Sequence, residues 1–239
     1  MHRWAFILSV ALLVHLQASA RQGSWNTSFV LRGNYTSSAK IFFNPDAATE
    51  QQRSQYLRVE DMTGAGAELR LQLSDENIFL TLSVDYISKT LNDPQYVSIG
   101  GSLQRVPGAE GLTFIPVEVA LNTYIPVSTE DFRMTMGGGI GMYYAVRSLS
   151  VLGVGTQVVN SPVGYGIHVN TGFEYRIRDG ISVRAALTFR DPEITNESKF
   201  EQETATFNGS PVTIRQSSFR SRIQVDGLTV SAGVLIDLF

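Results

Sequence analysis

Few side chains in this sequence combine in a way that could support catalysis. Of the three histidines in the 239 residues, only His168 lies outside the first twenty positions. A zinc site with two histidines is therefore not possible beyond that stretch, and a serine–histidine–aspartate triad could form only around His168. The residue alternates with Gly166 and Asn170 along a polar face. We interpret it as a structural histidine within a hydrogen-bonded polar network.

Paired carboxylates are a second feature that could do chemistry. Glu118 and Asp85 could share a proton in acid–base catalysis. The polar faces of the neighbouring segments carry arginines, however, and charges of both signs in one confined space are tolerated when they are paired. We therefore expect these carboxylates to neutralise arginines. The predicted charge network consists of Arg32, Glu68, Arg70, Asp85, Glu118, Arg133, His168, Glu174, Arg176, Arg184, Arg190 and Asp237.

Signals for a cofactor or for nucleic acid are weak. Residues 137–141 are rich in glycine, but no lysine and no helical pattern follow them, so they do not form a phosphate loop. Glycine at these positions indicates strand curvature or close packing. The chain has no cysteine, and its 19 basic and 22 acidic residues create no basic field for nucleic acid. We predict a non-enzymatic protein without catalytic residues, metal or cofactor, and without a nucleic-acid partner.

The segments that carry these residues alternate between apolar and polar positions. Every second residue from 115 to 125 is apolar or threonine, and the residues between them include Glu118, Asn122 and Tyr124. Strict alternation indicates a strand with two unlike faces, and about ten residues let a tilted strand cross a bilayer. Pro116 cannot donate a ladder hydrogen bond, so we expect it at the start of its strand, near the rim.

Eight such segments follow one another along the chain. They cover residues 25–35, 64–73, 78–86, 115–125, 132–144, 163–177, 181–190 and 228–239. Tight turns at 74–77, 128–131 and 178–180 alternate with long connections at 36–63, 88–111, 147–162 and 191–227. Long unstructured loops are uncommon in compact soluble domains, whereas outer-membrane barrels alternate short periplasmic turns with long extracellular loops. The pattern predicts an all-β, eight-stranded, antiparallel up-and-down transmembrane β-barrel.

The apolar face of each segment carries no charge and has aromatic side chains toward its ends. The predicted aromatic girdle consists of Trp25, Phe132 and Tyr175 near the short turns and Tyr35, Tyr86, Tyr144 and Phe189 near the long connections. Such girdles mark the two membrane–water interfaces. We therefore expect the apolar face to point outward. The inverse arrangement, with apolar residues around an internal ligand, would give a soluble lipocalin-like barrel.

The first twenty residues read as a secretory signal peptide. Basic His2 and Arg3 precede an apolar run at 4–16, and Ala18-Ser19-Ala20 is a small-x-small ending. We predict a signal peptide at 1–20 and one outer-membrane β-barrel domain at 21–239. Both ends of the barrel fall on the short-turn side, which would be the periplasm of a Gram-negative cell.

The whole of this predicted barrel domain resembles a known family. The resemblance is carried by the eight alternating strands, the glycine-rich fifth strand and the run Phe114-Ile115-Pro116-Val117-Glu118-Val119-Ala120-Leu121-Asn122-Thr123-Tyr124. These features resemble the small outer-membrane β-barrel-domain family of opacity-protein and OmpA/OmpW-like barrels. The resemblance implies a monomer that is inserted by the barrel-assembly machinery and contacts outer-membrane lipid and lipopolysaccharide.

An eight-stranded barrel is just wide enough for side chains to fill. We therefore expect a lumen closed by arginine–carboxylate pairs, and a role in envelope structure or in surface interaction through the extracellular loops. The alternative is a narrow porin-like channel for small or hydrophobic solutes, for which Phe114, Tyr124 and Tyr143 would supply only an apolar patch. The last connection, polar and rich in serine and threonine, is expected to be a mobile solvated loop or to contact a surface partner or lipopolysaccharide.

Overall fold

The computed structural model describes residues 27–73, 77–92, 94–99, 102–129, 131–214 and 218–238. The predicted signal peptide and Trp25 lie outside these ranges. The strands are β1 (Thr27–Phe42), β2 (Tyr56–Gln72), β3 (Ile78–Leu91), β4 (Gln95–Ile99), β5 (Ser102–Val106), β6 (Gly108–Tyr124), β7 (Phe132–Val151), β8 (Val154–Asn160), β9 (Gly164–Arg178), β10 (Ile181–Arg190), β11 (Glu193–Phe200), β12 (Thr204–Phe207), β13 (Ser210–Thr213), β14 (Phe219–Gln224) and β15 (Leu228–Asp237). A short helix, α2 (Glu50–Arg53), follows β1. No helix in the described ranges is long and apolar enough to span a membrane.

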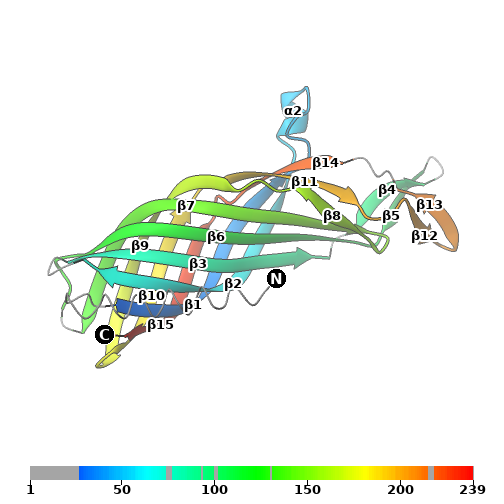
Figure 1. Cartoon of the computed structure of the whole chain (residues 1–239). Helices are drawn as coiled ribbons and strands as arrows, with labels where there is room; N and C mark the ends of the chain where they lie inside the picture. The colour runs from blue at the N-terminus through cyan, green and yellow to red at the C-terminus, as the bar shows by residue number, and fades with distance from the viewer. Residues whose placement is uncertain are drawn as a thin grey trace, which may run out of the picture.

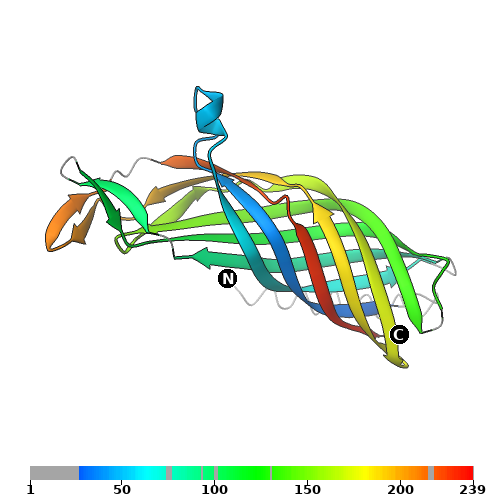
Figure 2. The ribbon, with the colours of Figure 1, turned by 180° about the vertical axis from the view of Figure 1, so that it is seen from behind.

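Eight strands close into a barrel, as the alternation predicts. Each pairs antiparallel with the next in the order β1, β2, β3, β6, β7, β9, β10 and β15, and β15 returns to β1. The closing seam holds Leu31 of β1 between Ala67 of β2 and Val234 of β15. Figures 1 and 2 show the strands tilted around this closed wall, with tight turns at one end and long extensions at the other.

The exterior of the barrel is apolar and its interior is polar. Ile140, Tyr165 and Ile167 are 69%, 74% and 74% exposed, whereas the intervening positions of the same strands face inward. This confirms the predicted orientation, because a lipocalin-like barrel would bury these side chains. The described members of the predicted girdle are all exposed: Tyr35, Tyr86, Phe132, Tyr144, Tyr175 and Phe189.

The long connections are more ordered than the sequence pattern indicated. Residues 191–227, expected to be a mobile loop, contain β11, β12, β13 and β14. Strand β14 pairs with the end of β1, β11 pairs with both β14 and β8, and β8 pairs with the end of β7. These strands continue the barrel wall beyond the aromatic residues on the long-connection side. We call this continuation the extracellular part.

Pro116 lies in the interior of β6 and not at its start, so the prediction for this residue was wrong. Strand β6 begins at Gly108, eight residues earlier in the chain. Pro116 is paired with Tyr143 on β7. On the other side the ladder to β3 runs up to Val117 and resumes at Phe114. The missing N–H is thus accommodated by an interruption of that ladder.

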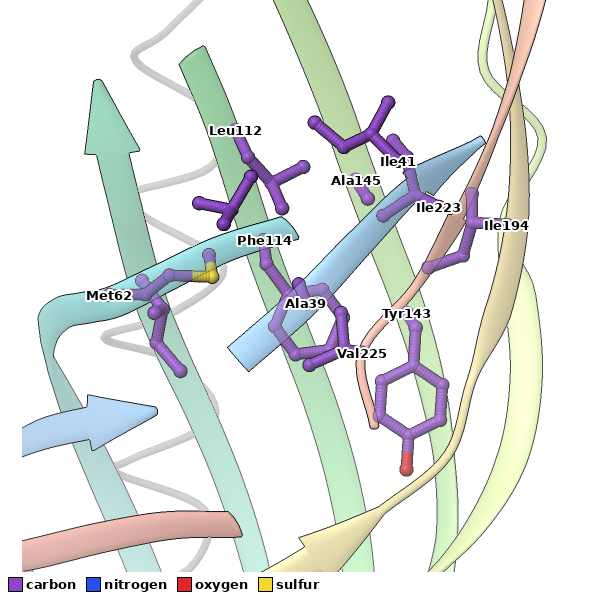
Figure 3. Close-up of a cluster of buried hydrophobic side chains, with 12 residues drawn as sticks. Ala39, Ile41, Met62, Leu112, Phe114, Tyr143, Ala145, Ile194, Ile223 and Val225 are labelled. Atoms are coloured by element: carbon purple, nitrogen blue, oxygen red, sulfur yellow. The ribbon is translucent and has the colours of Figure 1, made fainter. Parts of the chain in front are cut away.

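The extracellular part has an apolar core of its own. Twelve buried side chains from seven strands and the segment after β14 pack together inside the wall, several of them shown in Figure 3: Ala39, Ile41, Val59, Met62, Ile87, Leu112, Phe114, Tyr143, Ala145, Ile194, Ile223 and Val225. Phe114 and Tyr143 stack at 5.8 Å between ring centroids. Two members of the predicted apolar patch, Phe114 and Tyr143, are therefore part of a full cluster that fills the barrel above the membrane. The third, Tyr124, lies at the periplasmic mouth instead.

Candidate functional site

The most distinctive internal site is a buried ionic network halfway along the lumen. Its first centre is Glu68 on β2, which is 4% exposed. Arg32 Nη1 lies 2.7 Å from Glu68 Oε2, and Arg70 Nε lies 2.8 Å from Glu68 Oε1. The guanidinium group of Arg184, from β10, contacts the same carboxylate. One carboxylate thus joins three arginines from three strands.

The second centre of the network is Glu118 on β6. Arg190 Nε lies 3.0 Å from Glu118 Oε1, and the Tyr143 hydroxyl donates to the same oxygen over 3.0 Å. His168 Nδ1 lies 3.7 Å away from it. All of these side chains are at most 4% exposed. His168 therefore lies inside the buried network, but its Nδ1 is too far from Glu118 for the hydrogen bond expected from the sequence.

Two further carboxylates complete the network: Asp85 connects the two centres, and Glu174 pairs with arginines of the first. Asp85 accepts a hydrogen bond from Arg32 Nε over 2.9 Å and lies 3.7 Å from Arg190 Nη2. Glu174 lies 2.6 Å from Arg70 Nη2 and 3.6 Å from Arg184 Nε. The network therefore balances four arginines against four carboxylates whose side chains are all at most 8% exposed. Buried charges are tolerated under these conditions of close pairing.

Glycines on the inner face make room for these large side chains. A Cβ on Gly141 would lie 3.0 Å from Glu118 Cγ and still closer to the Tyr143 ring. A Cβ on Gly139 would overlap the backbone of β6. Close packing therefore explains the glycine-rich stretch of β7.

Three residues of the predicted network lie at the periplasmic mouth instead. Arg133, Arg176 and Asp237 line a vestibule of about 390 Å³ there. The Arg133 guanidinium group lies over the Tyr124 ring at 5.4 Å, and Asp237 accepts a hydrogen bond from Ser28 over 2.7 Å. Within the described ranges neither arginine forms an ion pair. Greater exposure to solvent at the ends of the strands explains the difference, because alternation assigns a face but not a depth.

Sequence reasoning missed a second ionic contact above the apolar cluster. Arg147 Nε donates to Glu110 over 2.6 Å, and Arg147 Nη1 donates to Ser221 over 2.7 Å. The same guanidinium group lies over the rings of Phe43 and Phe219, at 5.1 and 5.7 Å. These residues were assigned to long connections, so their inward direction was not recognised. The alternation of β6 and β7 continues past their predicted ends, and it places Glu110 and Arg147 on the inward face.

The lumen has little free space at the level of the network. A cavity of about 20 Å³ lies among residues that include Asn122, His168 and Asn170, which is room for about one water molecule. Asn122 Oδ1 and His168 Nδ1 have no hydrogen-bond partner in the part of the chain that the structure describes. Among the described residues, no group of three or more histidine or acidic side chains is placed to hold a metal ion. The arrangement neutralises charge and fills the lumen at this level.

Comparison with known proteins identifies the fold. No protein-family model and no curated protein sequence matches the chain. Among solved structures it is similar to the outer membrane protein OprG from Pseudomonas aeruginosa, with a TM-score of 0.56 and 15% identity over 91% of this chain and 98% of that one. Neisserial surface protein A matches with a TM-score of 0.43 and 10% identity over 88% and 97% of the two chains. Ail of Yersinia pestis gives 0.43 and 9% over 87% and 98%. With its apolar exterior and polar lumen, the chain has the fold of the small eight-stranded outer-membrane β-barrels.

Proposed function

We propose that this protein is a closed, non-enzymatic outer-membrane barrel that acts in envelope structure and in surface contact through its extracellular part. The observation that carries the proposal is the double filling of the lumen. The ionic network around Glu68 and Glu118 occupies the membrane-spanning part, and twelve apolar side chains occupy the part above it. A solute would have to displace paired charges and then a packed apolar core.

The surroundings of His168 support a role without catalysis. This candidate base is 4% exposed and contacts Glu118, and Arg190 is its partner in the neighbouring strand. A general base must lie within reach of the proton that it abstracts from a substrate. Here the imidazole is buried beside the charged side chains of the network.

The far end of the extracellular part is suited to contact with other surfaces. Figure 1 shows two small hairpins there, β4–β5 and β12–β13. Tyr96 on β4 is 65% exposed and Leu103 on β5 is 72% exposed. Large apolar side chains that stay in water are characteristic of interaction sites when they gather in patches, and these two project from strands that pair with each other.

Recording currents across planar lipid bilayers tests the closed lumen. Protein whose gel mobility shifts on boiling, and which is therefore folded, is expected to give no stable large conductance. A reproducible open level would overturn the closed-lumen proposal and favour the narrow channel.

Cell attachment tests the surface role. The double substitution Tyr96→Ser with Leu103→Ser is expected to reduce cell–cell aggregation and attachment to polystyrene. Val127→Ser is the matched control, because Val127 is 66% exposed in a turn on the periplasmic side. Equal attachment by the wild type, the double variant and cells without the protein would refute a role of the hairpins.

A further inference from the structure

A hollow of about 680 Å³ lies on the side of the extracellular part. One wall is the connection 43–55 between β1 and β2, which contains α2 and which we call the arm. Phe43, Asn44, Asp46 and Gln52 of the arm line the hollow. The opposite wall is formed by Glu197 of β11 and by Phe219 and Arg220 of β14. Figures 1 and 2 show the arm standing off sideways from the barrel wall, away from the hairpins at the far end.

The height of the arm above the membrane indicates what surrounds it. Tyr35 belongs to the aromatic band at the outer interface, and β1 continues for seven residues to Phe42, where the arm begins. Seven residues of a tilted strand rise by roughly 18 Å, whereas the headgroup layer adds only about 5–8 Å to the hydrocarbon core on each side. The hollow therefore lies above the lipid phosphates, at the level of sugars in a lipopolysaccharide leaflet.

Two aromatic rings in the hollow are held in place from inside the barrel. The Arg147 guanidinium group lies over both Phe43 and Phe219. Arg147 is itself 6% exposed and fixed by Glu110 and Ser221. Rings that are already positioned lose little conformational freedom when a ligand packs on them. The two phenyl rings offer flat apolar surfaces beside the polar side chains that line the same hollow.

The charges around the rings favour a neutral ligand. Arg220 Nη1 lies 3.4 Å from Asp46 Oδ2, and Arg220 Nε lies 3.9 Å from Glu197 Oε2. Two carboxylates thus face one guanidinium group, and the hollow has a small excess of negative charge. Phosphate or sulfate would be repelled, whereas hydroxyl groups can donate to the carboxylates. Asn44 and Gln52 add side-chain amides that both donate and accept.

We propose that this hollow binds a neutral hexose of the lipopolysaccharide that surrounds the barrel. A hexose presents an apolar C–H face, which fits the phenyl rings, and a rim of hydroxyl groups, which fits the carboxylates and amides. Small-molecule sites combine these features: apolar and aromatic lining with a few placed polar groups. The inference rests on the proposed outer-membrane location, but it does not depend on whether the lumen is closed or the hairpins bind a surface.

Binding can be measured by saturation-transfer NMR on the full barrel in detergent micelles. The first probe is core oligosaccharide released from lipopolysaccharide and dephosphorylated, and the second is maltoheptaose, a free glucan. We expect the core oligosaccharide to bind. Glu197→Gln or Phe43→Leu should lower the affinity for it at least fivefold. Glu203→Gln is the matched control, because this carboxylate lies between β11 and β12 and does not line the hollow. Each variant is first checked for the mobility shift on boiling.

Several results would overturn the proposal. Absence of binding at millimolar oligosaccharide rejects the site. If Glu197→Gln, Phe43→Leu and the control Glu203→Gln all lower the affinity equally, or if none of them lowers it, the sugar binds elsewhere. Equal affinity for maltoheptaose rejects the lipopolysaccharide leaflet as the source. A barrel that conducts, with saccharide binding intact, would refute the closed lumen and leave this site standing.

Discussion

Replacing Glu68 by glutamine tests whether the ionic network stabilises the barrel. The substitution preserves shape and removes one of the four negative charges. Arg32 keeps Asp85 at 2.9 Å and Arg70 keeps Glu174 at 2.6 Å, whereas Arg184 keeps only a contact of 3.6 Å with Glu174. Breaking a buried pair costs about 3–5 kcal/mol. Because two of the three arginines retain a short partner, we expect a loss of about 3 kcal/mol, at the lower end of that range.

The assay is urea unfolding in detergent micelles, with the folded fraction read from unheated gels. A loss of about 3 kcal/mol corresponds to a change of more than 100-fold in the folding equilibrium. Asp237→Asn is the control, because Asp237 is exposed at the mouth and its carboxylate bonds only to Ser28 among the described residues. Adding Arg184→Gln to Glu68→Gln should recover part of the loss, since it removes the uncompensated charge. The reasoning is refuted if Glu68→Gln unfolds at the same urea concentration as Asp237→Asn.

Three further changes test the packing of the interior. Gly139→Val places a side chain against the backbone of β6, so the variant should not fold into the barrel whose gel mobility shifts on boiling. A normal shift would contradict the close packing. Tyr143→Phe removes the buried hydrogen bond to the charged Glu118 carboxylate and should cost about 2 kcal/mol in urea unfolding; no change would mean that the hydroxyl is dispensable. The chain has no cysteine, so single introduced cysteines report access of a reagent to the lumen. A charged maleimide should label Ser182→Cys in the periplasmic vestibule and leave Ala145→Cys in the apolar cluster unlabelled. Rapid labelling of both would show an open lumen.

Alternation in the sequence was sufficient to predict the membrane-spanning wall. It assigned Glu68, Glu118 and Arg190 to the lumen and Tyr86 and Ile140 to the exterior, because one face of each strand must suit hydrocarbon. The depth of a side chain does not follow from alternation. This is why residues at the mouth and residues at the centre were assigned to the same network.

The extracellular part was not recognised because its pattern is weaker. Ile194, Asn196 and Ser198 face inward on β11, but only one of the three is apolar. Contacts between distant segments were also invisible: Glu110 and Arg147 are 37 positions apart, and Arg147 and Ser221 are 74 apart. Such pairs follow from the register of long strands, which the sequence alone does not define.

Along β6 the inward side chains change from polar to mainly apolar. The two halves of the barrel therefore lie in different surroundings and are stabilised by different forces. Within the membrane the inward side chains of β6 include Glu118 and Asn122, and above the membrane they include Leu112 and Phe114, with Glu110 beyond them paired to Arg147. Surrounded by hydrocarbon, the lower half gains nothing from moving apolar groups inward, and its packing depends on paired charges and hydrogen bonds. The upper half stands in water and depends on the hydrophobic effect, which weakens on cooling. Cold should therefore loosen the outer rim of the barrel while the membrane-embedded half keeps its structure.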